Sequence, residues 1–235
     1  MSDSIYTSEL LSEGVWCITQ GHVRMFLIEG KDQALLFDTG NPGGELAAYI
    51  GKLSQKPLTV VLSHAHGDHT GAAGQFPFVY LHPADFVMLP ADIGGHFLPL
   101  VKDQVFDLGD RRLETVEIPG HSPGSIALLD RTAGILFSGD TLQVGPIYMF
   151  GASASFESLL TSLDKLQELA PYYSAVYPCH NKLPVGPELI VHLREAARKM
   201  LSGELIGKEV ELRPGRMMWL YSYQDVSFYG PAMKA

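Results

Sequence analysis

The sequence predicts an α/β (α+β) protein in which two β-sheets pack face to face and helices cover the outside. Three observations carry this prediction. Short apolar or alternating runs of strand length dominate the chain, amphipathic runs of helical length interrupt them, and residues suited to metal chemistry follow the C-terminal ends of the strand-like runs. No linker, repeat or low-complexity segment divides the 235 residues, so we expect one domain over residues 1–235.

The first half of the chain is mainly strand-like. A continuous apolar run at 58–62 is typical of a strand that is buried on both faces. A helix over 45–53 has apolar residues on one face, and the Pro- and Gly-rich stretch 83–99 is expected to be irregular. The expected strands are 15–19, 23–28, 34–37, 58–62 and 78–81.

The second half alternates strands with two longer helices. Leucines at helical spacing predict a helix over 156–169, which Pro171 ends, and a further helix begins near Pro187 and ends at Gly203. The aromatic tail predicts a terminal hairpin, and it is compatible with either a homodimer contact or a covered sheet edge. The expected strands are 112–118, 125–129, 135–137, 175–177, 217–223 and 226–229.

Composition and charge narrow the class of partner. The formal net charge of −9 argues against a nucleic-acid partner, which normally needs a basic face. No run approaches the roughly 18 apolar residues of a membrane-spanning helix, and Met1–Ile5 lacks the features of a secretory signal. Cys17 and Cys179 are too few for a disulfide framework. We therefore expect a cytoplasmic protein, without a membrane partner, that acts on a small molecule.

Six consecutive residues indicate a metal site. His64-Ala65-His66-Gly67-Asp68-His69 offers three imidazoles and one carboxylate directly after the buried strand 58–62. These donors suit zinc and other borderline divalent ions. One tetrahedral ion could not easily accept all four from so short a segment, but two ions about 3.5–4 Å apart could share them. His121, Asp140 and His180, each in a loop after a predicted strand, are the candidates for the remaining ligands.

The segments that carry these residues resemble the motifs of the metallo-β-lactamase superfamily. The run from Ser63 to Gly71 is similar to its metal-binding signature. Four further segments match other motifs of the superfamily in the right order, over a stretch from about Val15 to His180. They are Phe37-Asp38-Thr39-Gly40, Gly120-His121-Ser122-Pro123-Gly124, Ser138-Gly139-Asp140-Thr141 and Cys179-His180.

The resemblance implies a four-layer αββα sandwich with two metal ions at one edge of its sheets. Zinc is the expected metal, and iron or manganese would suit the same donors. Asp38 would accept a hydrogen bond from a ligand imidazole, and Asp68 would orient the attacking water and take its proton. The implied ligands are His64, His66 and His121 for one ion, Asp68, His69 and His180 for the other, and Asp140 as a bridge.

Departures from the motifs of particular subfamilies narrow the reaction. True β-lactamases of this type have Cys or Ser in place of Asp140, so antibiotic hydrolysis is not expected. Thioesterases resembling glyoxalase II have a basic residue in the loop after the bridging Asp, whereas the segment 142–155 contains no Lys or Arg. It offers Tyr148, Met149 and Phe150 instead, which are expected either to line an apolar substrate pocket or to pack in the core. His96 is a candidate for the opposite wall of that pocket, with plain exposure as the favoured interpretation.

The leading hypothesis is therefore a dinuclear metal-dependent hydrolase that cleaves an ester, thioester, lactone or similar bond in a small molecule. A persulfide dioxygenase-like oxidoreductase with a single iron is an alternative, and so is a small-molecule phosphodiesterase. The substrate and the native metal stay open at this point, and metal content would separate the hydrolase from the dioxygenase.

Overall fold

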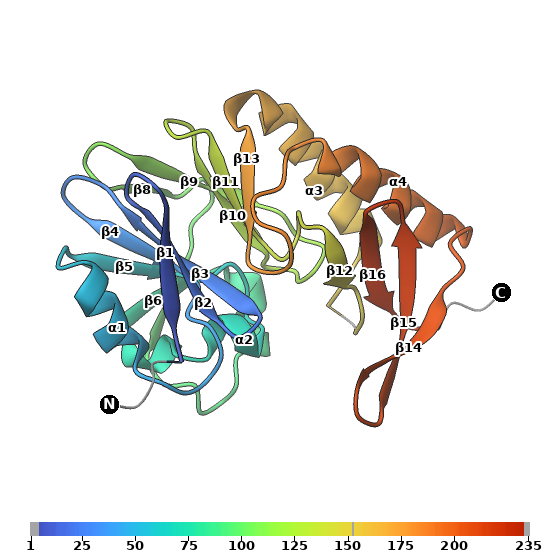
Figure 1. The fold of residues 1–235 in the computed structure, drawn as a ribbon, viewed down its shortest axis with the longest axis horizontal. Coiled ribbons are helices and arrows are strands. Elements are labelled where there is room, and N and C mark those ends of the chain that lie inside the picture. The colour runs from blue at the N-terminus through green and yellow to red at the C-terminus, as the bar shows by residue number, and fades with distance from the viewer. Residues whose placement is uncertain (1–4, 152, 233–235) are drawn as a thin grey trace.

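A computed structural model describes residues 5–151 and 153–232. Of the segments discussed above, Met1–Ser4 and Ala152 lie outside the described residues. The N-terminal half forms a seven-stranded sheet in chain order, antiparallel from β1 to β4 and parallel from β4 to β7 (Figure 1). Its strands are β1 (Thr7–Ser12), β2 (Val15–Gln20), β3 (Val23–Glu29), β4 (Ala34–Phe37), β5 (Leu58–Val61), β6 (Phe78–Leu81) and β7 (His96–Pro99).

The second half forms a five-stranded sheet that faces the first. Its order is β13-β11-β10-β9-β8, and only the pair β11–β13 is parallel. All five residues of β10 and all five of β11 are buried, as expected for strands between two layers. The strands are β8 (Val105–Asp107), β9 (Arg112–Glu117), β10 (Ile126–Asp130), β11 (Ile135–Gly139) and β13 (Ala175–Pro178).

Helices cover the outer faces of both sheets. The helix α1 (Leu46–Leu53) packs on the seven-stranded sheet, and α3 (Phe156–Leu169) and α4 (Leu189–Ser202) pack on the five-stranded sheet. The short α2 (Gly67–Thr70) follows β5, and 3-10 turns occur at Ala73–Gln75, Pro83–Met88 and Ala170–Tyr172. The predicted αββα sandwich is therefore confirmed. No helix within the described residues is long and apolar enough to span a membrane.

Two local signals determine where the long helices begin and end. The side chain of Ser155 accepts a hydrogen bond from the amide of Ser158 at 3.1 Å, which satisfies a free donor at the start of α3. Gly203 ends α4 with a φ of 74°, the left-handed conformation that glycine adopts at little cost. The start of α3 and the end of α4 lie where the sequence predicted them. The start of α4 is at Leu189, two residues after Pro187.

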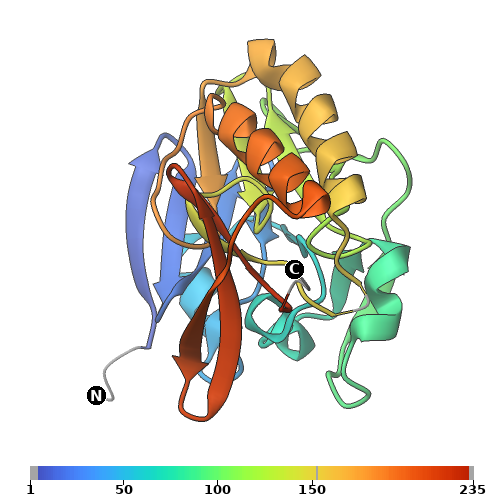
Figure 2. The same cartoon turned by 90° about the vertical axis from the view of Figure 1, so that its right-hand side faces the viewer.

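A third sheet lies beside α4 and was not predicted as a sheet. The predicted hairpin forms β15 (Arg216–Tyr223) and β16 (Val226–Gly230), to which β12 (Gly145–Tyr148) and β14 (Lys208–Arg213) add in the order β12-β16-β15-β14. The sequence gives only a weak signal for both added strands, because β12 begins with Gly-Pro and four of the six residues of β14 are charged. Figures 1 and 2 show β14 and β15 extending away from the sandwich as an arm.

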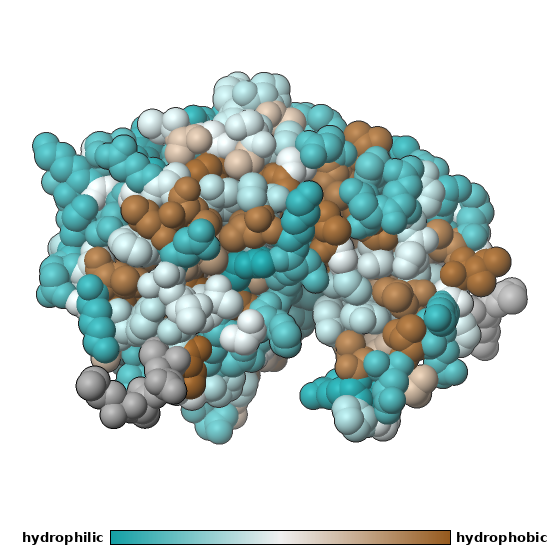
Figure 3. Space-filling model, in the orientation of Figure 1, coloured by the Kyte–Doolittle hydropathy of each residue, from teal (hydrophilic) through white to brown (hydrophobic). Residues whose placement is uncertain are grey.

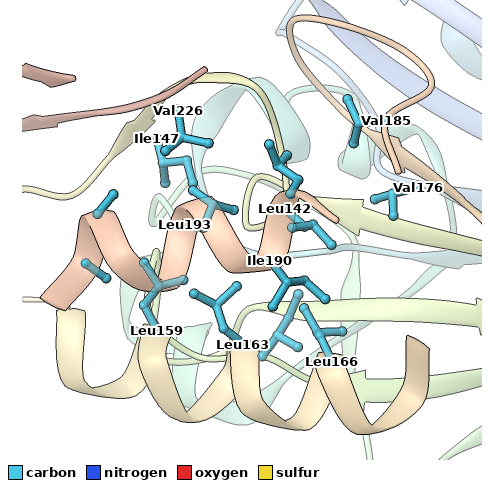
Figure 4. Packing of buried hydrophobic residues seen from close by; sticks show 14 of the residues in the cluster. Leu142, Ile147, Leu159, Leu163, Leu166, Val176, Val185, Ile190, Leu193 and Val226 are labelled. Carbon is cyan, nitrogen blue, oxygen red and sulfur yellow. The ribbon is translucent and has the colours of Figure 1, made fainter. Parts of the chain in front are cut away.

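Three apolar clusters hold these layers together. One fills the space between the two large sheets, and another lies between the seven-stranded sheet and α1. The largest joins the five-stranded sheet, α3, α4 and the third sheet, so the third sheet shares its core with the sandwich. Figure 4 shows Leu159, Leu163 and Leu166 of α3 and Ile190 of α4 between the two helices, and Leu193 of α4 beside Ile147 and Val226 of the third sheet.

Candidate metal centre

The seven predicted ligands come together at the C-terminal ends of strands. His64 and His66 lie in the loop after β5, and Asp68 and His69 lie in α2. The loop between β9 and β10 carries His121, and Asp140 and His180 follow β11 and β13. Strands that are buried on both faces are rigid, so short loops at their ends hold these side chains in place.

Three imidazoles form the first group of donors. The Nδ1 atom of His66 lies 2.9 Å from Nε2 of His64 and 2.8 Å from Nε2 of His121, and the two Nε2 atoms are 3.1 Å apart. His64 and His121 are buried. Three ring nitrogens that converge on one point in this way are a donor set typical of zinc.

A second group lies beside the first. The Oδ2 atom of Asp68 is 3.8 Å from Nε2 of His69 and 3.3 Å from Nε2 of His180. His69 is fully buried, whereas the side chain of Asp68 is 39% exposed. This exposure leaves one carboxylate of the site open to solvent and to a substrate.

Asp140 lies between the two groups. Its Oδ1 is 3.4 Å from Nε2 of His69, and its Oδ2 is 3.4 Å from Nε2 of His180 and 3.7 Å from Nε2 of His121. One carboxylate therefore faces nitrogens of both groups. This is the position that a ligand shared by two ions would occupy.

Asp38 holds the loop of the first histidines from behind. Its Oδ2 accepts hydrogen bonds from Nδ1 of His69 at 2.8 Å, from Oγ of Ser63 at 2.8 Å and from Sγ of Cys179 at 3.2 Å. Oγ of Ser63 also lies 2.9 Å from Nδ1 of His64. Asp38 thus fixes two ligand rings, one directly and one through Ser63, as the sequence predicted for a ligand imidazole.

Backbone carbonyls orient two further rings. Nδ1 of His121 donates to the carbonyl of Tyr148 at 2.9 Å, and Nδ1 of His180 donates to the carbonyl of His22 at 2.7 Å. A ring that donates from Nδ1 keeps the lone pair of its neutral form on Nε2. In both residues Nε2 is the atom that faces the donor cluster.

The environment favours neutral imidazoles in the first group. Burial lowers the pKa of His64 well below its usual value, and it lowers the pKa of His66 to about 4. Burial also lowers the pKa of His121. Metals bind the neutral imidazole, so these three rings are in the form that a ligand needs.

The second group is more strongly charged. Burial raises the pKa of the Asp140 carboxyl, but His69 and His180 outweigh burial and hold that pKa well below its usual range. Burial also raises the pKa of the Asp68 carboxyl. The hydrogen bond with His180 outweighs burial, and the pKa falls to about 2. Both carboxyls are therefore ionised, as ligands of a cation must be.

Two buried atoms test whether metal ions fit this arrangement. Nε2 of His69 and Oδ1 of Asp140 are buried and face each other at 3.4 Å, but neither has a hydrogen-bond partner of adequate geometry within the described residues. A buried polar atom without a partner costs about 1–3 kcal/mol. The lone pairs of the first group also repel one another unless a cation lies between them. The residues present therefore fit two divalent ions.

Asp85 is a buried carboxylate that the sequence reading missed. It lies in the 3-10 turn Pro83–Met88, and its Oδ2 accepts hydrogen bonds from the amide of Ala65 at 3.0 Å and from Oγ of Ser122 at 2.7 Å. Its Oδ1 accepts from the amide of Gly124 at 2.6 Å. Asp85 thus ties the loop of His64 and His66 to the loop of His121. No motif marks it, because its partners are distant in the sequence.

The metal-binding residues form the floor of an open cleft of about 1010 Å³. One wall is the turn between β2 and β3, and the other is the third sheet with the segment that follows β12. Figure 3 shows the surface hollowed between the body of the sandwich and the lobe that the third sheet forms. Of the four predicted pocket residues, Tyr148 and Phe150 line this cleft, and their rings lie 5.6 Å apart.

The structure does not bring Met149 and His96 to the cleft. Met149 is buried in the cluster beneath the third sheet, because successive side chains of an extended segment point to opposite sides. His96 lies on β7, the edge strand of the seven-stranded sheet, where its ring packs at 6.0 Å from that of Phe78. The pocket predicted from these residues is thus corrected to one with Tyr148 and Phe150.

Basic residues enter the cleft from elements that the sequence reading did not consider. The absence of Lys and Arg from the segment 142–155 suggested a cleft without cations. Arg24 on β3 and the pair Arg213 and Arg216 on the β14–β15 hairpin nevertheless line it. Only the pairing of distant strands places these three side chains together, so no local pattern could have found them.

Comparison with known proteins confirms the resemblance read from the motifs. The family described as the metallo-beta-lactamase superfamily matches residues 18–180. The probable metallo-hydrolase YqgX of Bacillus subtilis is 32% identical over 201 residues, which cover 76% of this chain and 91% of that protein. The acyl-coenzyme A thioesterase MBLAC2 of Homo sapiens is 27% identical over 214 residues, which cover 70% of this chain and 76% of that protein.

Solved structures share the fold. The metallo-beta-lactamase FIM-1 from Pseudomonas aeruginosa, in a mono-zinc form, aligns with a TM-score of 0.67 at 22% identity, over 83% of this chain and 96% of that one. TTHA1623, in a di-iron-bound form, aligns with a TM-score of 0.60 at 28% identity, over 73% of this chain and 93% of that one.

Proposed function

Because the chain belongs to the metallo-beta-lactamase superfamily, we propose that it is a hydrolase that binds two divalent metal ions and cleaves thioesters of small thiol carriers. One observation carries the two-ion part of this proposal. Both donor groups are complete, and Asp140 faces nitrogens of each. A site for a single ion would not need the second group, Asp68, His69 and His180, at such short distances.

The ions, when bound, supply a Lewis acid and a water of lowered pKa. The residues of the chain hold the site together and orient the water. All seven ligands are buried or partly buried, and Asp68, whose side chain is 39% exposed, is the carboxylate that the cleft floor leaves open to solvent. Its pKa of about 2 keeps it ionised, so it is able to orient a water and accept its proton. Asp38 and the carbonyls of Tyr148 and His22 hold the imidazole rings of His69, His121 and His180 in position.

The choice of a thioester rests on the relatives and on the cleft. MBLAC2 is named an acyl-coenzyme A thioesterase. The segment 142–155 contributes no cation to the cleft, but Arg24 on β3 and Arg213 and Arg216 on the β14–β15 hairpin line it. Such cations suit the anionic carriers on which biological thioesters are built. Zinc fits the donor set best, and iron or manganese also suit it.

Elemental analysis of the purified protein and a panel of ester, thioester, lactone and phosphodiester substrates test this function. We expect two metal equivalents per chain and hydrolysis of a thioester in preference to the other three classes. One iron per chain with oxygen uptake on a persulfide would show a dioxygenase and overturn the proposal. Preferred cleavage of a phosphodiester would keep the two-ion site and overturn the substrate class.

A further inference from the structure

Two arginines face each other at the end of the β14–β15 hairpin. Arg213 and Arg216 are paired across the two strands, on either side of the turn Pro214-Gly215. Both line the cleft. The side chains of paired residues lie on the same face of a sheet, so the two guanidinium groups are neighbours on the cleft side of the arm.

This pairing is unfavourable unless an anion offsets it. Like charges directly opposite each other destabilise a pair of strands. Within the described part of the chain, the arginines that form ion pairs are Arg111, Arg131 and Arg194, and neither hairpin arginine has a carboxylate within 4.0 Å. The acidic residue of the hairpin tip, Glu211, accepts a hydrogen bond from the amide of Gly215 at 2.9 Å instead.

The neighbourhood of the pair positions these cations in the cleft. The guanidinium carbon of Arg216 lies 5.4 Å from the centre of the Phe150 ring, within cation–π range. From the body of the sandwich, Arg24 donates to the carbonyls of Pro178, at 3.3 Å, and of Asn181. These carbonyls flank the ligand His180. Positive charge thus lies both beside the metal centre and on the arm.

The charge of the cleft contrasts with that of the molecule. The chain has a net charge of −9. Among the lining residues, the only carboxylates are the metal-binding Asp68 and Asp140, whereas the three other permanently charged residues are all arginines. A cleft of about 1010 Å³ is at the upper end of the range for small-molecule sites, so it has room for much more than an acyl group.

We propose, as an extension that rests on the proposed thioester hydrolysis, that Arg213 and Arg216 form a subsite for the anionic end of the thiol carrier, with Arg24 contributing from the opposite wall. The acyl thioester then lies over the metal centre and the carrier extends along the third sheet past Tyr148 and Phe150. Phosphates and carboxylates are both anions with paired oxygens that accept hydrogen bonds from a guanidinium group, so either suits this subsite.

The test compares carriers that differ in charge. Wild type and the double variant Arg213→Gln/Arg216→Gln are assayed with an acyl-coenzyme A, an S-acylglutathione and the uncharged S-acyl-N-acetylcysteamine, all with the same acyl group. Arg198→Gln, an exposed arginine on α4, is the matched control. We expect the double variant to lose about 10- to 100-fold in kcat/KM on an anionic carrier, mainly through KM, and less than about 2-fold on the neutral one.

The carrier that is affected identifies the anion. A loss with acyl-coenzyme A alone indicates phosphate, and a loss with S-acylglutathione alone indicates carboxylate. An equal loss on all three substrates, or none on any, overturns the subsite but leaves thioester hydrolysis standing.

A binding measurement separates failure of the subsite from failure of the proposed function. Calorimetry with desulfo-coenzyme A and with S-methylglutathione, which have no free thiol to bind a metal, needs no turnover. We expect one of the two to bind the metal-loaded wild type and to lose about 10-fold or more in affinity in the double variant. If wild type cleaves no thioester, the proposed function fails and this titration alone decides the subsite. Equal affinity in both proteins, or no binding of either ligand, overturns it.

Discussion

The floor and the outer wall of the cleft are built in opposite ways. On the floor, the ligands sit in short loops at the ends of buried strands, and the side chains of His69 and Asp140 are 0% and 7% exposed. The wall is a small third sheet in which Tyr148, a residue that lines the cleft, is 37% exposed. The floor therefore has the rigidity that metal chemistry requires, and the wall has the open surface that contacts a substrate.

A hydrogen bond links the wall directly to one ligand ring on the floor. The carbonyl of Tyr148, the last residue of β12, accepts the hydrogen bond from Nδ1 of His121. The next residue, Met149, is anchored through its amide to the carbonyl of Tyr229 on β16. Because a backbone carbonyl holds the ligand ring, the wall side chains that face the cleft are able to vary without removing this hydrogen bond. Substitutions on the floor should affect metal binding and turnover, and those on the wall should affect KM.

The largest effect is expected on the floor. The double variant His64→Ala/His66→Ala removes two of the three donors of the first group. We expect the loss of at least one metal equivalent per chain and a fall in kcat of more than about 10⁴-fold, since the reaction depends on the ions. Elemental analysis and turnover assays measure both. The matched control is His192→Ala on α4, whose ring pairs with Asp225 outside the cleft. Full activity of the double variant would sink the two-ion mechanism.

Asp68→Asn should separate the effect on the catalytic step from the effect on metal binding. The substitution keeps the shape of the side chain but removes the charge that orients water and accepts its proton. We expect kcat to fall about 10²- to 10⁴-fold, with the first group still able to hold its ion because its three nitrogens are unchanged. Metal content and kcat are measured together. A variant that retains both ions and wild-type kcat would show that another group handles the proton.

Asp85→Asn tests the support beneath the floor. The carboxylate accepts three hydrogen bonds from two ligand loops, and an amide in its place cannot accept all of them. We expect metal affinity to fall about 10- to 100-fold, as is typical when a partner that orients the ligands is lost, together with a lower Tm of the metal-free protein. Asp92→Asn, at an exposed loop position, is the control. Unchanged metal affinity with a lower Tm would reduce Asp85 to a purely structural role.

The contrast between floor and wall also explains what could be predicted from the sequence. The ligands come from contiguous motifs that follow strands with strong apolar patterns, such as β5, predicted at 58–62 and observed at Leu58–Val61. Metal ions need particular donor atoms at short spacing, so the residues of the floor are recognisable without knowledge of the fold.

The wall lacks such local signals. The strand β12 contains Gly145 and Pro146, and four of the six residues of β14 are charged, so neither strand has a strong apolar pattern. The strand β12 forms because β16, far along the chain, pairs with it. The same reason hides Asp85 and the hairpin arginines, since their role depends on neighbours that only the folded chain brings near.

The smallest effects should come from the wall itself. We expect Tyr148→Ala to raise KM about 3- to 10-fold and to leave metal content unchanged, since it removes an aromatic surface of the cleft but keeps the backbone carbonyl that holds His121. His96→Ala is the matched control, because its ring packs on Phe78 at the far edge of the seven-stranded sheet. Steady-state kinetics and elemental analysis of the two variants decide the matter. If Tyr148→Ala lost metal, or if His96→Ala raised KM as much, the division between a floor that binds metal and a wall that binds substrate would not hold.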